Sequence, residues 1–382
     1  MSLDCCVGLV DNAIANGKST IEKAIGINIS GFMDVGYNWA SSHPSNPANI
    51  SGRYFDKDYN KVEFNDFNIT LDKPEKDWGV GFHFAADFGR TAELLREATF
   101  WGRTLHKEPS VELRESYLTT TIPLGAGIGV KGGLFVTPLG TEIISAPGAY
   151  NDNISRSFLF NLGVPLRHLG TLFSYPIYQK DKDTTVATAS AGVITGWDDP
   201  RDTNKTPSFL GGVNVTPDDK FTFTSNFTAG EEPVTAFPPN ARNTARFVIS
   251  NVWTVKPIDP LGVSLEYTWG HQRKASLGQT RDATWQGVAA ITSYAWTDRF
   301  TTALRGEFFD DRDGARVGGS PNGHARVKLA EGTLTGAYKF TKMLLGRVEV
   351  RYDRSDEAVF KVGSSNFDRS QTTLAWQLIY TY

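Results

Sequence analysis

Charged side chains alternate in sign at every second position in two late segments of this 382-residue chain. "LLGRVEVRYDR" places Arg347, Glu349, Arg351 and Asp353 two residues apart, and "TTALRGEFF" places Arg305 and Glu307 in the same relation. In a β-strand, residues two apart point to the same face. Arginine beside carboxylate can form charge-assisted pairs that stiffen a wall, or set up a transverse field that favours polar solutes over apolar ones. The sequence leaves both interpretations open.

Motifs for covalent or metal chemistry are missing from the sequence. The 6 histidines are scattered, and none stands at ligand spacing from a cysteine or another histidine. No serine occupies a G-x-S-x-G elbow. "NGKST" at 16–20 lacks the first glycine of a phosphate-binding loop and has no preceding strand. We therefore expect no enzyme activity, no cofactor and no metal site.

Alternation of apolar and polar residues identifies the elements that would carry these charges. The chain ends in "TTLAWQLIYTY", in which Leu374, Trp376, Leu378, Tyr380 and Tyr382 alternate with smaller or more polar residues. Similar segments recur from "INISGFMDVGYNW" onward. A period of two predicts strands with one apolar and one polar face.

Composition limits the classes of protein that such strands can build. The net charge is -3 and charged residues make up 21%, so there is no basic surface for nucleic acid. The two cysteines, Cys5 and Cys6, are adjacent and predict no disulfide framework. No run approaches 18 apolar residues, as a transmembrane helix would need. A mean hydropathy of -0.30 resembles a soluble protein, but a membrane β-barrel averages the same way because its two faces cancel.

Link lengths between the expected strands favour the barrel. Short links at 73–76, 123–127, 216–219, 256–260, 297–299 and 341–343 alternate with long ones at 40–59, 88–110, 138–166, 197–206, 229–243, 271–282, 310–325 and 354–367. About sixteen strands of membrane-crossing length result. We predict an all-β fold: a closed transmembrane antiparallel β-barrel with short periplasmic turns and long external loops. A soluble β-sandwich or propeller remains the alternative, although no propeller repeat is visible.

Positions of two kinds follow from this fold. Aromatic residues collect at the interfaces of such barrels. The expected girdle is Trp39, Trp78, Trp269, Trp376, Tyr380 and Tyr382. The third long link, 138–166, is expected by analogy with sixteen-stranded channels to fold into the lumen. Glu142 and Arg156 would then be constriction charges, together with the six strand charges above. A loop that only caps the outside is the alternative.

Several segments resemble one family, the OmpL-like β-barrel porins, also called β-barrel porin family 2. The resemblance begins at "ISGFMDVGYNW" and is clearest in "KGGLFVTPLGTE" and "NDNISRSFLFNLGVPLRHLGTLFSYP". It continues in "GVITGWDDPRDTNK", "ALRGEFFDDRDGAR" and "VEVRYDRSDEAVF", and spans most of 27–382. It implies a passive porin for small hydrophilic solutes in the outer membrane of a Gram-negative bacterium.

The same resemblance implies partners and domain limits. They are the lipid bilayer, the barrel-assembly machinery acting on the C-terminal strand, and further copies in a homotrimer. Residues 1–26 are expected to be a periplasmic lead, a short helix or disordered, without the basic-then-apolar pattern of a secretory signal. The barrel is expected over 27–382. The alternative function is a structural barrel around a periplasmic partner such as an electron carrier.

Overall fold

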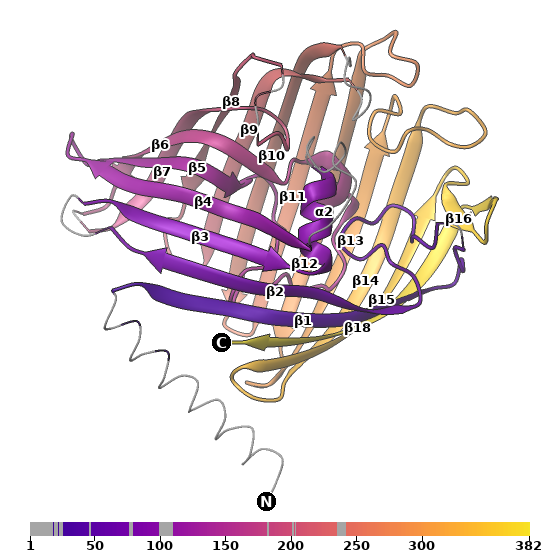
Figure 1. Ribbon diagram of the computed structural model, residues 1–382, viewed down its shortest axis with the longest axis horizontal. Helices are drawn as coiled ribbons and strands as arrows, with labels where there is room; N and C mark the ends of the chain where they lie inside the picture. The colour runs from indigo at the N-terminus through magenta and orange to yellow at the C-terminus, as the bar shows by residue number, and fades with distance from the viewer. Residues whose placement is uncertain are drawn as a thin grey trace, which may run out of the picture.

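The protein is a closed antiparallel β-barrel with one end of short turns and one end of long loops (Figure 1). This computed structural model describes residues 18, 22, 26–45, 47–75, 79–98, 110–181, 183–200, 202, 204–234 and 242–382. Within these ranges sixteen strands form the barrel, each paired with its neighbours in chain order, and β1 closes on β18. The predicted fold class is confirmed, and the sandwich and propeller alternatives are wrong.

The barrel strands are mostly 12 or 13 residues long, which suits a tilted crossing of a bilayer. Their bounds are β1 Asn28–Ala40, β2 Lys61–Lys73, β3 Gly81–Phe88, β4 Val111–Ile122, β5 Ile128–Val136, β6 Arg167–Gln179, β7 Thr185–Ile194, β8 Ser208–Val215, β9 Phe221–Pro233, β10 Asn243–Ile258, β11 Leu261–Gln272, β12 Ala283–Ala295, β13 Phe300–Asp311, β14 Val327–Lys339, β15 Leu344–Ser355 and β18 Ser370–Thr381.

Alternation along each strand sorts side chains between the two faces of the wall. In β15, Val348 and Val350 are 63% and 41% exposed, whereas Arg351 between Val350 and Tyr352 is fully buried. In β13, Leu304 is 58% exposed and Arg305 is fully buried. A lipid-facing charge costs about 2–4 kcal/mol at the bilayer midplane. The apolar side chains therefore face lipid, and the charges face the interior.

Closure of the barrel depends on the C-terminal strand. β18 pairs with β1 in a register that sets Met33 opposite Tyr380 and Val35 opposite Leu378. The last residue belongs to the same pairing, because Tyr382 and Gly31 of β1 exchange backbone hydrogen bonds of 3.0 and 3.2 Å. The Tyr382 hydroxyl reaches across β1 and donates to the backbone oxygen of Asn68 in β2 at 2.8 Å. The paired backbones of β1 and β18 leave no open edge between these two strands, as the hydrocarbon region requires.

Long and short connections alternate as the sequence predicts. Short turns such as 123–127 and 340–343 connect strands at one rim of the barrel. Long loops such as 41–60 and 137–166 connect strands at the other rim. Additional elements lie in the long loops: the helix α2, Arg90–Ala98, the single π-helical turn η1, Leu159–Gly163, and the hairpin of β16, Phe360–Val362, with β17, Asn366–Asp368. No helix among the described residues is long and apolar enough to cross a membrane.

Three of the long loops pack inside the barrel near the long-loop rim. The helix α2 lies against the interior of β2, β3 and β4 (Figure 1). Its Leu95 packs with Ile144, Phe160 and Leu166 of the third long loop, and with Phe55 of the first. Of the predicted lead at 1–26, the described residues are Lys18, Glu22 and Gly26. The Glu22 carboxylate accepts the Ile29 backbone N–H at 2.8 Å.

Candidate constriction site

The third long loop, residues 137–166, is bound to the inner wall by two carboxylates. Glu349 of β15 accepts the backbone N–H groups of Ile154 and Ser155 at 2.6 and 3.0 Å. Glu307 of β13 accepts those of Phe158 and Leu159, both at 2.6 Å. Hydrogen bonds from N–H groups to a carboxylate are stronger than neutral ones. These four backbone N–H groups lie in an irregular segment and would otherwise have no hydrogen-bond acceptor, so the two carboxylates satisfy them.

Arginines of the same strands bind the loop from its carbonyl side. Arg305 donates to Glu142 in the loop at 2.8 Å and to the backbone oxygen of Ser155 at 2.6 Å. A third bond from Arg305 reaches Glu331 of β14 at 2.6 Å. Since Arg305 is fully buried, it needs these acceptors to offset the loss of water around its charge.

A second arginine, Arg351 of β15, repeats this arrangement in register with Arg305. Arg351 donates to Asp353 at 2.6 Å and to the backbone oxygen of Arg156 at 2.6 Å. Arg53 of the first long loop completes the group with a bond to Asp353 at 2.9 Å. Towards the short-turn rim, Arg347 donates to Gln377 at 2.9 Å and to the Asn151 backbone oxygen at 2.5 Å.

Apolar packing holds the part of the loop that follows the charged contacts, at residues 158–163. Phe158 and Leu159 are fully buried and pack in one cluster with Trp285 and Phe309 of the inner wall. The Trp285 indole N–H donates to the Gly163 backbone oxygen at 3.1 Å. Burial of apolar surface on this scale adds a few kcal/mol per large side chain. The loop is therefore held by polar bonds along its length and by apolar packing at η1.

All eight predicted constriction residues meet at this contact between loop and wall. The six strand charges face inward, and Glu142 and Arg156 lie in the loop, yet Arg305, Arg351 and Asp353 have no exposed surface. Arg305 and Arg351 bind the third loop, and Asp353 binds Arg53 of the first long loop, in place of solvent. Arg156 donates to the Ser145 hydroxyl at 3.0 Å and lies over the Phe55 ring at 5.2 Å. Burial lowers the pKa of Arg156 from its usual range. A selective role for all eight stays a prediction.

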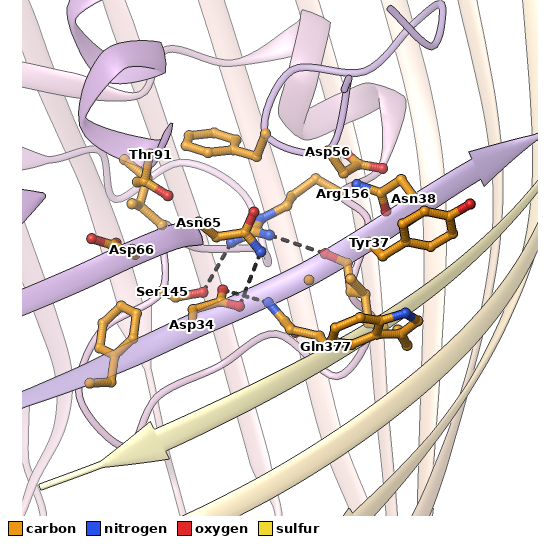
Figure 2. A pocket seen from close by; sticks show the side chains of 16 residues that line it. Asp34, Tyr37, Asn38, Asp56, Asn65, Asp66, Thr91, Ser145, Arg156 and Gln377 are labelled. Atoms are coloured by element: carbon orange, nitrogen blue, oxygen red, sulfur yellow. Dashed lines mark hydrogen bonds between the residues drawn. The ribbon is translucent and has the colours of Figure 1, made fainter. Parts of the chain in front are cut away.

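A polar cavity lies between the loop and the wall formed by β1, β2 and β18. Figure 2 shows Arg156 and Ser145 on the loop side facing Asp34, Asn65 and Gln377 on the wall side. Asp66 of β2, Asp56 of the first long loop and Thr91 of α2 also line it. The cavity volume is about 30 Å³, which is room for roughly two waters.

Sequence reasoning predicted Arg156 here but missed the acidic wall. Asp34 follows Met33 and precedes Val35 in a segment read mainly for its apolar face. Asp34 lies between them on the opposite, inward face, so its place in the alternation was a usable signal. Asp66 is harder to assign, because the register of β2 against β1 shifts between Asp34 and Val35. A bulge of this kind moves the following side chains to new positions.

The predicted aromatic girdle is spread over different heights of the wall. Trp39 and Trp269 lie near the long-loop ends of β1 and β11, and Tyr380 and Tyr382 near the short-turn end of β18. Trp376 lies in the middle of β18 and stacks on Tyr37, with ring centroids 6.5 Å apart. Trp78 lies outside the described residues. Whether these rings form interfacial belts stays a prediction.

Comparisons with known proteins agree with the geometry. The chain resembles solved structures at low sequence identity. It matches the outer membrane channel DcaP of Acinetobacter baumannii with a TM-score of 0.60 and 13% identity, covering 93% of this chain and 97% of that one. It matches OprB of Pseudomonas putida in a high-pH structure with a TM-score of 0.61 and 12% identity, covering 96% and 97%.

A third solved structure, an anion-selective porin from Comamonas acidovorans, matches with a TM-score of 0.61 and 12% identity over 93% of this chain and 99% of that one. At these identities the likeness establishes the fold. No curated protein matches the chain in sequence. The family model described as beta-barrel porin-2, OmpL-like, matches residues 26–382. The chain therefore belongs to the OmpL-like β-barrel porin family 2, whose members are barrels of the bacterial outer membrane.

Proposed function

We propose that the protein is a passive channel for small hydrophilic solutes or ions, narrowed at mid-height by the loop 137–166. The observation that carries the proposal is the capture of four loop N–H groups by Glu307 and Glu349. Because the loop is bound to the wall at residues 154–155 and again at 158–159, it has one position in the lumen. The size of the passage is then set by the wall that the loop does not cover.

Small hydroxyl side chains on the inner wall near the short turns support an aqueous lumen. Ser264 lies on the same face of β11 as Glu266, whose carboxylate accepts the Thr141 N–H of the loop at 2.8 Å. Thr254 of β10 contacts Ser264 across the strands at 3.1 Å. Thr222, Thr254, Ser264 and Ser293 are all half-buried rather than sealed. A lining of this kind offers donors and acceptors to water and to polar solutes.

The alternative of a sheath around a protein partner is not supported. The interior holds α2 and the third loop, which pack through Leu95, Ile144 and Phe160. An electron carrier would have to displace both. Membership of a porin family describes a channel rather than an enzyme, and our proposal requires no chemical step.

Partners of the channel are part of the same proposal. The bilayer contacts the apolar outer face, which includes Leu334, Val348 and Leu374. A homotrimer is the oligomer we propose, because one solved neighbour with a TM-score of 0.55 is a trimer form of OmpT from Vibrio cholerae. The alternating aromatic end of β18 is the segment we propose for recognition by the assembly machinery.

Reconstitution tests the proposed function. Purified protein in planar bilayers is expected to give stepwise, ohmic conductance. The folded state is checked by the shift in gel mobility between unheated and heated samples. Folded protein that leaves the bilayers silent would contradict the channel.

A further inference from the structure

We propose that the loop between β13 and β14, residues 312–326, is a gate that closes the long-loop mouth of the barrel through Arg316. The inference rests on the proposed channel function and specifies how the passage opens. The third long loop narrows the barrel at mid-height and stays bound to the wall. The gate loop closes the mouth above it, and solutes pass when the gate loop moves outward.

Inward side chains in the long-loop half of the barrel have almost no contact with solvent. A water-filled bore along these strands would expose them, and an apolar layer blocks ions because water leaves it. The described residues therefore show a closed mouth. One inward side chain from each of the strands β5–β8 and β10–β15 is at most 2% exposed: Phe135, His168, Ile194, Leu210, Val248, Thr268, Trp285, Phe309, Leu329 and Arg351.

A turn at the start of the gate loop brings Arg316 to this layer. Asp311, the buried last residue of β13, accepts the backbone N–H groups of Ala315, Arg316 and Val317 at 3.0, 2.9 and 2.6 Å. Ala315 and Val317 pack against the apolar cluster of the inner wall. Three bonds to one carboxylate bend the chain inward, so the gate loop enters the mouth instead of standing above it.

The Arg316 side chain connects the gate loop to two other loops. It donates to the backbone oxygen of Leu162 in the third long loop. Its guanidinium also lies over the rings of Trp197 and Trp285, 4.9 and 5.3 Å from their centroids. Trp197 belongs to the link between β7 and β8, and the two indoles meet edge to face at 6.5 Å. Arg316 is thus the point at which three loops join across the mouth.

The two indoles cover the inner wall of β10 and β11. Val248 of β10 stands opposite Gly270 of β11. A Cβ on Gly270 would lie 2.1 Å from the Trp285 ring, so this ring lies against the wall. Two residues from Val248, on the same face of β10, the Arg246 guanidinium lies 4.8 Å from the Trp197 centroid. Val248 is therefore a position that water reaches only when the gate is open.

The contacts of Arg316 are weaker than those of the third long loop. Glu307 and Glu349 bind four N–H groups of the third loop with charged acceptors, and such bonds are strong. Among the described residues, the Arg316 side chain has one hydrogen bond, to an uncharged oxygen. Its remaining contacts are cation–π contacts, which are modest where water competes. The gate loop should therefore leave the mouth before the third loop leaves the wall.

Neighbouring charges also make the closed position of Arg316 less favourable. Burial lowers the pKa of Arg316 to about 10, and the like charge of Arg246 acts in the same direction. Asp198 and Asp311 offset part of this effect, although each also accepts backbone N–H groups. Outward movement returns the guanidinium to water, where its charge is better solvated.

Glycines on both sides of Arg316 allow the tip of the loop to move. Gly314, Gly318 and Gly319 have φ of 75°, 85° and 77°. A Cβ on Gly318 would meet nothing within 4 Å, so this part of the loop is loosely packed. Segments with few packing contacts open at the lowest cost. Arg316 can therefore move outward while β13 and β14 remain paired.

Single-channel recording tests the gate. The wild-type current is expected to alternate between open and closed levels. Arg316→Ala is expected to lower the ratio of closed to open time by about tenfold. Trp197→Ala is expected to act in the same direction, whereas Trp197→Phe keeps a ring for the guanidinium and should resemble the wild type. The matched control is Arg312→Ala, at an exposed position of the same loop, which is expected to leave the ratio unchanged.

The accessibility of Val248 tests where the gate lies. Val248→Cys is made in a Cys5→Ser/Cys6→Ser background, which removes the two natural cysteines. A charged methanethiosulfonate reagent is added on the long-loop side. It is expected to modify Val248→Cys about tenfold faster when Arg316→Ala is present than when Arg312→Ala is present.

Failure of the gate is distinguishable from failure of the channel. Steady conduction without closures, or equal closed-to-open ratios in Arg316→Ala and Arg312→Ala, would overturn the gate and leave the channel standing. Equal modification rates at Val248→Cys would do the same. Trypsin cleavage after Arg156 is expected at the wild-type rate in Arg316→Ala, and faster cleavage would assign the opening to the third loop and overturn the gate. Shifted gel mobility of each variant shows that it is folded.

Discussion

Arg305 and Glu142 form an ion pair of 2.8 Å, with both side chains buried, between β13 and the third long loop. The two residues are 163 positions apart. Neither charge could remain in the interior alone, because an unpaired buried charge is strongly destabilising. The pair therefore couples the position of the loop to the wall, and the same logic applies to the N–H groups held by Glu307 and Glu349.

Releasing the loop should expose it to protease. In Glu349→Gln the acceptor for Ile154 and Ser155 loses its charge, at a cost of about 1–3 kcal/mol. We expect faster trypsin cleavage after Arg156, which is 8% exposed in the bound loop. Glu231→Gln, at an exposed position of β9, is the control. Equal cleavage rates in the two variants would show that Glu349 does not hold the loop.

Removing the Arg156 side chain should change the current through the channel. Arg156 lines the cavity and makes side-chain bonds within the loop to the Ile154 backbone and the Ser145 hydroxyl. Arg156→Ala takes away bulk and positive charge together, so we expect higher single-channel conductance, shifted ion selectivity, or both. An unchanged channel would place this part of the loop outside the conducting path.

The seam of the barrel should depend on the small size of Gly31. A Cβ at Gly31 would lie 2.3 Å from the Tyr382 hydroxyl oxygen and 2.2 Å from the Asn68 backbone oxygen. Overpacking costs about 1–3 kcal/mol, so Gly31→Val should lower the temperature at which the barrel unfolds on gels. Gly332→Val is the matched control, because a Cβ at Gly332 meets nothing within 4 Å. Equal melting temperatures of Gly31→Val and Gly332→Val would show that the close contact of Gly31 with Tyr382 does not contribute to the stability of the barrel.

A lysine on the outer face should destabilise the barrel more, the closer it lies to the middle of the membrane. Val350, 41% exposed, lies in the middle of β15. We expect Val350→Lys to destabilise the barrel by about 2–4 kcal/mol, as lysine does at the midplane. Val62→Lys, one residue from the long-loop end of β2 and 65% exposed, should cost about 0–1 kcal/mol. Denaturant titration in lipid vesicles measures both, and equal losses would contradict the membrane placement.

Local patterns were sufficient for the strands and most connections. Alternation of Arg347, Glu349 and Arg351 against Val348 and Val350 assigned the two faces correctly, because the cost of a lipid-facing charge leaves one choice. The link between β6 and β7 was not among the predicted short turns. The link 180–184 contains no glycine or proline, the residues that mark a turn most strongly.

Long-range contacts explain what the sequence could not supply. The helix α2 has only nine residues, and isolated helices so short are marginal. It depends on Leu94 and Leu95, which are fully buried inside the barrel. The acidic wall of Asp34 and Asp66 depends on a register shift that no local pattern marks. Arg305 and Arg351 bind loop oxygens instead of water, and this could be predicted only if the path of the loop through the barrel were known.

Single-channel conductance of the wild type and of the double variant Glu307→Gln/Glu349→Gln, in the same bilayers, tests the loop constriction most directly. The double variant loses the charged acceptors of four loop N–H groups. We predict larger or more variable conductance steps than in the wild type, from protein whose gel mobility shows a folded barrel. Steps of identical size from equally folded protein would contradict a constriction held by these two carboxylates.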